Sequence, residues 1–513
     1  MKIPLLKNTF TNYIGMLVRL LQGVLIVRWI IADLGEAQYG LWGLLWSFFC
    51  YALLLDFGMG AAAQKVTATG LWRNSIERYN RTVSTILCTY LLMSLVIIII
   101  TLIGAYFVVD LLKLDGVDSG LVSYYRACFI CSGFGAALIF PLGVITEIVV
   151  GLQKMYLRNY INIVSKVVEL AGIIIIFALG GGLLTLLVFS LIIIGVGQLA
   201  LLYCCYRDIP GLRLRITLDW IIFKEIFHFS GAAYIISVMR MVWERGPAIL
   251  LGAFCGLESV STYLLGCRFP VMMIMFTGPY QENIAPLSAL LHSHRKQSSL
   301  AAILLDSMRW NSFLATGLAI GVIIYSRVLI RALLGVESDA AVLISRITVV
   351  SVYLWLIFRF IPERYLLMAE RHKFLAVTYI IDSVLFVLLS VLLLAAGVSA
   401  DTGAYIIMIT SILSRLFSTM ALILPCMLKD TGLRLGAVLL ETVFRPLLFS
   451  IPVILLALAE YILLMERIND FVLLCIAGLS CGPLYLFLAY RGMVSAPEKA
   501  AVFKKIKKFW YKK

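Results

Sequence analysis

The chain has very little charge for its length. Only 14% of its 513 residues are Asp, Glu, Lys or Arg, whereas 62% are hydrophobic, and the mean hydropathy is +1.00. A soluble domain is about one quarter charged and about half apolar. A soluble chain of this composition would have too few polar side chains to cover its surface. The composition therefore excludes a water-soluble globular protein and predicts an integral membrane protein.

Several signatures of chemistry are also missing. No polar stretch is long enough for a soluble catalytic domain, and no Gly-rich Walker loop is present to bind nucleotide phosphates, which excludes ATP hydrolysis on this chain. His292 and His294 have no acidic or cysteine ligands near them in the sequence, so we expect no metal site and no cofactor. The 11 cysteines lie mostly within apolar runs, where a thiol is a small hydrophobic side chain, and they indicate no disulfide framework.

What the sequence has in quantity is apolar runs of about 20 residues, the length that crosses a bilayer as a helix. We count fourteen, which predicts an all-α polytopic membrane protein. The runs are 10–31, 39–63, 82–108, 122–148, 161–180, 184–206, 228–252, 259–280, 300–325, 341–363, 375–395, 403–428, 443–464 and 471–490. Short breaks with turn residues, such as AAGVSAD, separate them.

Basic residues are distributed unevenly over these breaks. With the N-terminus placed inside, the inner breaks hold most of the Lys and Arg, and the outer breaks hold only Lys113, Arg327, Arg331 and Arg467. Because cytoplasmic loops are enriched in Lys and Arg, the bias predicts that both termini are cytoplasmic. The basic tail, 491–513, has interleaved aromatic residues and is predicted to lie on the anionic inner leaflet. We expect no nucleic-acid partner.

An internal repeat relates two parts of the chain. The segment YGLWGLLWSFFCYALLLDFGMGAAAQK, from Tyr39, is similar to YLLGCRFPVMMIMFTGPYQENIAPLS, from Tyr263, and each follows a short outer loop that contains glycine. Asp56 then aligns with Tyr280. The repeat pairs the first span with the seventh and predicts an N-lobe (1–206, spans 1–6), a C-lobe (207–428, spans 7–12) and an added pair of spans (429–490).

This layout resembles the polysaccharide-exporter branch of the multidrug/oligosaccharidyl-lipid/polysaccharide flippase superfamily. The resemblance rests on LGEAQYGLWGLLWSFFCYALLLDFGMGAAAQK, with its outer-loop LG and YG, its D-x-G and a basic residue, and on WERGPAILLGAFCGLESVSTYLLGCRF in the second half. It extends over the whole chain in helix number and topology. It implies a flippase that moves lipid-linked oligosaccharides across the inner membrane by alternating access between two lobes.

Arginines inside the predicted spans are the candidate binding residues. A charged side chain at the bilayer centre costs about 2.5–3.5 kcal/mol on insertion scales, so it needs a reason to be there. Arg19 lies near the middle of its span, whereas Arg28 lies close enough to the outer end to reach the interface. Arginine binds phosphate through two parallel hydrogen bonds and stays charged when buried. We therefore expect an anionic headgroup, such as a diphosphate, to bind the mid-membrane cations, namely Arg19, Arg240, Arg245 and Arg415.

Other charged residues are candidates for gating or ion coupling. Arg240 and Glu244 are four residues apart and can pair along one helix face, as can Arg359 and Glu363. Each of these pairs is also consistent with a purely structural role, and so is a pair between Asp382 and Arg415. The candidate gating or coupling residues are Asp56, Glu244, Arg359 and Asp382.

The sequence thus predicts a non-enzymatic flippase for an undecaprenyl-diphosphate-linked repeat unit of O-antigen, capsule or exopolysaccharide. Alternatives are a flippase for the lipid-linked peptidoglycan precursor, a cation-coupled multidrug exporter, and, from a different class, a polytopic polymerase or ligase. The last of these usually has a large outer loop, which is missing here. The partners implied are the lipid-linked oligosaccharide, the membrane, a polysaccharide polymerase and a coupling H⁺ or Na⁺.

Overall fold

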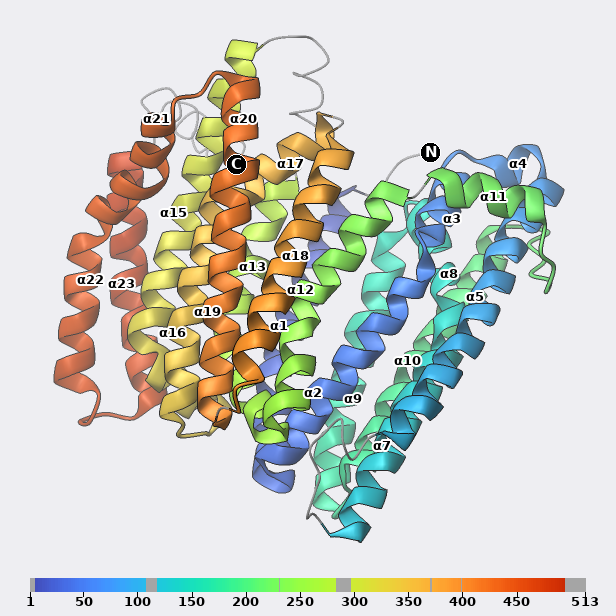
Figure 1. Cartoon of the computed structure of the whole chain (residues 1–513), viewed down its shortest axis with the longest axis horizontal. Coiled ribbons are helices and arrows are strands. Elements are labelled where there is room, and N and C mark those ends of the chain that lie inside the picture. Colours follow the sequence, from blue (N-terminus) through green and yellow to red (C-terminus); the bar gives the residue numbers. More distant parts are fainter. Residues whose placement is uncertain are drawn as a thin grey trace, which may run out of the picture. The chain divides into compact units, whose positions relative to one another are not determined.

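The computed structural model describes residues 5–107, 118–229, 231–282, 297–369, 371–397 and 399–493, and every regular element in these ranges is a helix (Figure 1). The first part of the chain forms α1 (Leu5–Leu34), α2 (Glu36–Ala52), η1 (Leu53–Asp56), α3 (Met59–Ala68), α4 (Leu71–Asn74), α5 (Ile76–Tyr106), α7 (Ser119–Ile139), η2 (Phe140–Leu142), α8 (Gly143–Gly151), α9 (Met155–Ala178), α10 (Leu183–Asp208), α11 (Trp220–Phe229) and α12 (Gly231–Cys255).

The later part forms α13 (Leu257–Glu282), α15 (Gln297–Leu329), η3 (Ile330–Leu334), α16 (Asp339–Trp355), η4 (Leu356–Phe360), α17 (Ile361–Met368), α18 (His372–Leu394), α19 (Ala400–Ser418), η5 (Thr419–Ile423), α20 (Leu424–Thr431), α21 (Leu435–Leu439), η6 (Leu440–Phe444), α22 (Arg445–Leu464) and α23 (Asp470–Met493).

Each of the predicted spans coincides with a helix or a run of short helices. Within the described residues, 12 helices are long and apolar enough to cross a membrane. The two remaining predicted spans fall on α2 to α3, where α2 ends after 17 residues, and on α12, which has charged residues near its centre. The chain is therefore an all-α, multi-pass membrane protein. The number fourteen and the cytoplasmic termini stay predictions.

The sides of the helices expose large apolar side chains. Water-soluble proteins rarely leave extended apolar surface in contact with solvent. Here Leu138 of α7, Leu179 after α9 and Leu479 of α23 are each about four-fifths exposed, with exposed fractions of 78%, 81% and 78%. Lipid tails are the surroundings in which such side chains are stable, because a hydrocarbon environment does not penalise apolar surface.

The residues group into two compact units. The first unit comprises residues 1–264 and 379–410, and the second comprises 265–378 and 411–513. A buried core in the first unit joins α3, α5, α8 and α10 through side chains such as Met59, Ile86 and Ile148. A core in the second unit joins α15, α22 and α23 through Val328, Ala457 and Leu473. The predicted lobe boundaries at residues 206 and 428 stay predictions.

In both loops aligned by the internal repeat, a glycine with a left-handed backbone follows the preceding helix. Gly35 ends α1 with a φ of +84°, and Gly256 ends α12 with a φ of +89°. In both, the glycine N–H donates to a carbonyl of the preceding helix, Ile31 in one case and Leu251 in the other. A left-handed residue at this position terminates a helix, and glycine adopts it without steric cost. A new helix with a glutamate in its first turn follows each glycine.

Helix irregularities differ between the units. The second unit contains the π turns η3, η4, η5 and η6. The described part of the first unit contains the 3₁₀ turns η1 and η2 instead, and η2 includes Pro141. A π turn holds an extra residue in a helix and often marks a site with a special side-chain arrangement. In the second unit, two of these turns carry Arg331 and Arg359.

Candidate functional site

Asp56 lies where the second predicted span is interrupted in the first unit. α2 is followed by the short turn η1, and the backbone of Phe57 and Gly58 is then left-handed, with φ values of 49° and 76°. The Asp56 carboxylate accepts a hydrogen bond of 2.8 Å from the N–H of Gly60 at the start of α3. It also accepts one from the hydroxyl of Tyr90 in α5. Asp56 thus stabilises the beginning of α3, as a capping carboxylate does.

A second carboxylate approaches Asp56 around Gly60. A Cβ atom placed on Gly60 would lie 3.1 Å from Cγ of Glu147, 3.3 Å from Oδ2 of Asp56 and 3.3 Å from the hydroxyl of Tyr90. Glu147 belongs to α8, and α8 packs closely against α3. Glycine at position 60 therefore leaves room for two acidic side chains and a tyrosine at one point. Such an arrangement can hold a proton or a small cation, because two neighbouring carboxylates repel each other when both are ionised.

Two arginines lie near each other on α1 and α9. Arg19 is exposed, and its Nη1 atom lies 3.5 Å from the Cβ position of Gly15, on the face of α1 that meets Ile163 of α9. Arg158 of α9 lies within electrostatic range of both Arg19 and Glu147. Among the described residues, neither Arg19 nor Arg158 makes a salt bridge. Two neighbouring guanidinium groups that make no salt bridge are suited to an anion that both can contact.

The acidic residue next along α9 has a different environment. Glu169 is buried, and its carboxylate accepts hydrogen bonds from Gln22 (2.7 Å), Lys166 (2.8 Å) and Ser190 (2.8 Å). The lysine neutralises its charge, and the three donors occupy its oxygens. Glu169 is therefore a structural group that connects α1, α9 and α10.

Arg245 is the half-buried cation of α12. Its Nε atom is buried and has no hydrogen-bond partner among the described residues. It lies within electrostatic range of Cys50 and Tyr51 in α2. The Cβ position of the next residue, Gly246, is 3.7 Å from the Tyr51 hydroxyl. A buried guanidinium nitrogen without an acceptor is costly, and a bound anion would supply the missing hydrogen bond.

Tyr51 lines an apolar pocket within the first unit. It has a cavity volume of about 180 Å³ and lies between α2, α5 and α7. Aromatic and aliphatic side chains form most of its wall. Its lining is Leu45, Phe48, Phe49, Tyr51, Ala52, Leu55, Ile97, Ile100, Thr101, Phe129, Ser132, Gly133 and Ala136. Tyr51 thus lines this apolar pocket and also lies within electrostatic range of Arg245.

The remaining candidates of the first unit lie on α12 and α18. Arg240 and Glu244 are exposed. Asp382 of α18 is 1% exposed, and its neighbour Ser383 donates a hydrogen bond of 3.2 Å to the carbonyl of Met239. α18 therefore packs beside the charged part of α12, and it brings Asp382 into the region that also holds Arg245.

The candidates of the second unit are engaged with its own residues. Arg359, in the π turn η4, is 1% exposed; its Nε is 3.4 Å from the carboxylate of Glu363, and its Nη1 donates to the Ser418 hydroxyl at 2.8 Å. Arg415 lies with its guanidinium 5.4 Å from the ring centroid of Trp355, a cation–π contact. Arg359 is therefore buried and held by Glu363 and Ser418, and it does not lie at a solvent-exposed surface.

Sequence reasoning missed three members of these clusters. Tyr90, Glu147 and Arg158 lie on α5, α8 and α9, and nothing in their local sequence relates them to Asp56 or Arg19. His292, His294, Tyr280 and the basic tail after residue 493 lie outside the residues whose side chains the structure describes. Within the described ranges, no three His, Cys, Asp or Glu side chains gather as metal ligands would.

Comparison with known families gives a match over most of the chain. The family described as "Polysaccharide biosynthesis protein" matches residues 34–343. A comparison with curated protein sequences finds no match.

Solved structures share the fold. An inward closed conformation of the lipid II flippase MurJ is 14% identical with a TM-score of 0.69, covering 95% of this chain and 99% of that one. An inward-facing multidrug resistance MATE family transporter is 15% identical with a TM-score of 0.65, covering 82% and 96%. A MOP superfamily transporter from Pyrococcus furiosus is 16% identical with a TM-score of 0.56, covering 81% and 95%. At these identities the likeness shows the fold alone.

Proposed function

Because the chain belongs to the family of polysaccharide biosynthesis proteins, we propose that it is a flippase for undecaprenyl-diphosphate-linked oligosaccharide repeat units. The family resemblance expected from the sequence is confirmed, and the fold is that of membrane flippases and transporters. The proposal adds the substrate, the inner (cell) membrane as location, and use of the product for a surface polysaccharide such as O-antigen, capsule or exopolysaccharide.

The observation that carries the proposal is the position of Arg245 beside the apolar pocket of the first unit. A substrate with a fixed negative charge and a long hydrocarbon chain needs both features close together. Arg245 has a buried nitrogen without an acceptor, and Tyr51 joins its surroundings to the pocket between α2, α5 and α7. A diphosphate that reaches Arg245 would have an apolar wall beside it for the first part of a prenyl chain.

Further arginines in each unit are candidates for headgroup binding. Arg19 with Arg158 supplies two further guanidinium groups on α1 and α9. Arg240 supplies a cation one helical turn before Glu244, and Arg415 supplies one in the second unit. We assign headgroup binding to Arg19, Arg240, Arg245 and Arg415, as the sequence suggested. Arginine suits this task because its fork matches phosphate oxygens.

Gating or coupling is assigned to the acidic residues and to Arg359. Asp56 shares the space around Gly60 with Glu147 and Tyr90, which makes it the best placed acceptor for a coupling H⁺ or Na⁺. Glu244 precedes Arg245 on α12, and Asp382 is buried on α18, which packs against α12 through Ser383 and Met239. Arg359 fixes the π turn η4 through Glu363 and Ser418. Transport would proceed by alternating access between two lobes, and a polysaccharide polymerase would use the product.

The alternative substrates differ in a way that a lipid analysis detects. A peptidoglycan precursor flippase carries the same diphosphate and prenyl chain with a different sugar. A multidrug exporter binds cations, for which an arginine without an acidic partner is unsuitable because like charges repel. The arginine excess therefore favours either lipid-linked substrate over a cationic drug.

The test is mass spectrometry of lipid-linked intermediates in cells that lack the protein. We expect a complete diphosphate-linked oligosaccharide to accumulate, and the wild-type chain to restore the normal pool. Arg245→Ala should fail to restore it, and Arg245→Lys should restore it in part. A normal pool in cells sensitised to cationic dyes would reject the flippase, and accumulation of the peptidoglycan precursor alone would reject the proposed substrate.

A further inference from the structure

The connector between α10 and α11 is fastened along α5 in the first unit. Asn80 donates to the carbonyl of Gly211 at 2.9 Å and accepts from the N–H of Arg213 at 3.1 Å. One turn further along α5, Ser84 accepts from the N–H of Arg215 at 3.0 Å. These side chains lie on one face of α5 and pair with backbone groups of the connector. The connector therefore keeps a fixed path although it contains no helix.

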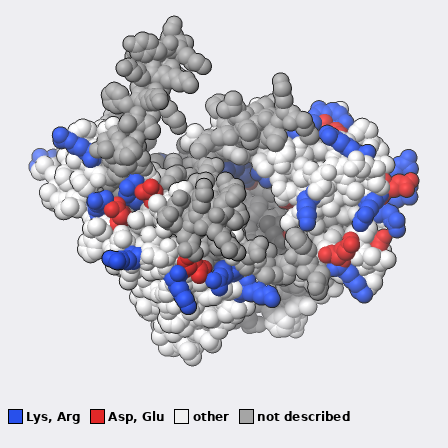
Figure 2. All heavy atoms as spheres, turned by 90° about the horizontal axis from the view of Figure 1, so that it is seen from above, with Lys and Arg blue, Asp and Glu red and all other residues white. Residues whose placement is uncertain are grey.

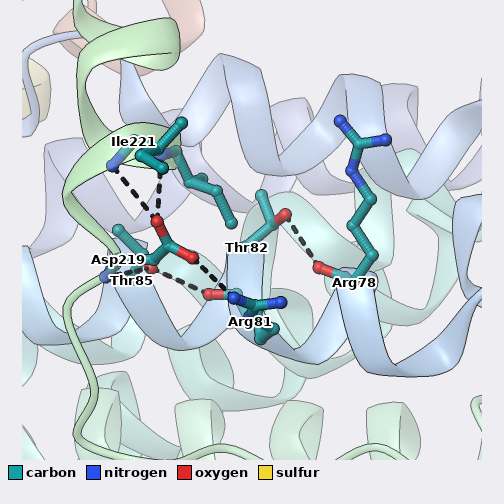
Figure 3. A network of polar contacts seen from close by, with 7 residues as sticks. Arg78, Arg81, Thr82, Thr85, Asp219 and Ile221 are labelled. Carbon is teal, nitrogen blue, oxygen red and sulfur yellow. Dashed lines mark hydrogen bonds and ion pairs between the residues drawn. The ribbon is translucent and has the colours of Figure 1, made fainter.

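Asp219 completes this attachment and starts α11. Its N–H donates to the hydroxyl of Thr85 at 3.1 Å, and its carboxylate is 3.1 Å from Arg81. The other carboxylate oxygen accepts from the N–H groups of Ile221 and Ile222, which caps α11 (Figure 3). The start of α11 is thus tied to the first turns of α5, at one end of a spanning helix.

The fastened segment exposes apolar and cationic side chains together. Ile216, Trp220 and Ile221 are 75%, 57% and 77% exposed, and Leu218 is also exposed. The exposed cations of the same segment are Arg213, Arg215 and Lys224. Trp220 is stacked on Phe223, with 5.0 Å between ring centroids, and the Lys224 ammonium lies 5.8 Å from the Trp220 centroid. Figure 2 looks onto the end of the molecule that carries α11 in Figure 1, and most of its coloured side chains are Lys or Arg.

We propose that residues 213–224 form a docking surface for anionic phospholipid headgroups. Exposed Ile, Trp and Leu side chains are unfavourable in water, and α11, with 10 residues, is too short to cross a bilayer. A position at the membrane–water interface accommodates both the apolar and the cationic side chains of the segment. The apolar side chains enter the upper part of the acyl layer, and Arg and Lys extend to the phosphates. Arg213, Arg215 and Lys224 make no salt bridge with the described residues, and they select anionic over zwitterionic headgroups.

The hydrogen bonds between the connector and α5 give this surface a defined geometry. Because the backbone of Arg213 and Arg215 is hydrogen-bonded to α5, their side chains leave the connector at fixed points, two residues apart. In an extended segment such residues project from the same side. The two unesterified oxygens of a phosphodiester headgroup can then be contacted by more than one guanidinium.

The test uses fluorescence quenching of Trp220 in vesicles. The full chain is reconstituted in vesicles with equal amounts of phosphatidylglycerol and phosphatidylcholine, in which the acyl chains of one or the other lipid are brominated. The signal of Trp220 is the difference between the unchanged chain and Trp220→Phe. We expect stronger quenching by brominated phosphatidylglycerol than by brominated phosphatidylcholine, although the overall composition is identical.

The variant Arg213→Gln/Arg215→Gln/Lys224→Gln should make the two lipids quench equally. One cation near an anionic surface strengthens binding by about fivefold, so the loss of three is decisive. The matched control, Lys373→Gln/Lys429→Gln/Arg434→Gln, removes three exposed cations from the second unit and should keep the preference. Added salt should abolish the preference of the unchanged chain without abolishing quenching. The proposal would be overturned if both lipids quenched the unchanged chain equally or if neither quenched it. It would also be overturned if the control variant lost the preference for phosphatidylglycerol.

Discussion

Arg245 in the first unit and Arg359 in the second have opposite surroundings. Arg359 is almost completely buried, and its guanidinium is satisfied by Glu363 of its own helix and by Ser418. Arg245 is half-buried beside Cys50 and Tyr51, and its Nε has no acceptor among the described residues. The first is an arginine whose partners are built into the fold. The second is an arginine for which we propose a partner that is not part of the protein.

This difference separates structural from binding cations. A buried ion pair is costly to break, because one uncompensated charge remains behind. Arg245 is not part of such a pair. Its removal from the unliganded protein therefore leaves no buried carboxylate without a counter-ion. Breaking the ion pair of Arg359 should therefore mainly lower stability, whereas substitution of Arg245 should mainly lower transport.

The largest effect is expected from Glu363→Ala. The change leaves the guanidinium of Arg359 buried without its carboxylate and should lower the free energy of unfolding by about 3–5 kcal/mol. Thermal unfolding of the purified protein in detergent measures it. The double variant Arg359→Met/Glu363→Leu should recover most of the loss. An unfolding temperature of Glu363→Ala equal to that of the unchanged chain would remove the distinction between the two arginines.

Arg245→Ala should show the reverse pattern. We expect flipping of the lipid-linked oligosaccharide to fall by about 10- to 100-fold, the range of a lost hydrogen bond to a charged group, with an unfolding temperature close to that of the unchanged chain. Transport into the outer leaflet of reconstituted vesicles measures the first quantity. A large drop in stability with unchanged specific transport would make Arg245 a second structural arginine.

A smaller effect on stability is expected from Asp56→Ala. The loss of the hydrogen bond to the Gly60 N–H removes the cap of α3 and should cost about 0.5–2 kcal/mol. Tyr90→Phe removes the second donor to the same carboxylate and should cost less, because Gly60 still holds Asp56 in place. Under the proposed coupling role, Asp56→Ala should also abolish the dependence of lipid flipping on the H⁺ or Na⁺ gradient. Tyr90→Phe should retain this dependence.

The smallest effect is expected from Arg28→Gln. This residue is exposed near the end of α1, and substitution of an exposed side chain changes the free energy of unfolding by about 0.5 kcal/mol or less. Transport should stay normal. Arg19→Gln is the matched change on the same helix, and it should reduce transport with an equally small effect on stability. Equal transport by the two variants would contradict the assignment of Arg19 to the headgroup site.

The helices could be predicted from the sequence, because runs of about 20 apolar residues have few other stable states in a membrane. The chain turn at Gly35 and its repeat at Gly256 were also visible, since a glycine between two helical patterns marks a helix end. The cluster around Gly60 was not, because Tyr90 and Glu147 approach Asp56 from other helices. The burial of Arg359 was equally hidden, because the sequence shows the spacing to Glu363 but not the packing that covers the pair.

The π turns of the second unit also bear on how its chain length can vary. A helix with a π turn holds one residue more than the same axial distance requires, so deletion of a single residue can restore regular α-helical winding. In a regular α-helix such as α16, the loss of one residue rotates everything that follows by about 100°, since an α-helix turns through 360° in 3.6 residues. In η4 the loss of one residue is absorbed by the return to regular winding, so the helix parts before and after the turn keep their relative orientation. A one-residue deletion within η4 should therefore be less damaging than a one-residue deletion in the middle of α16.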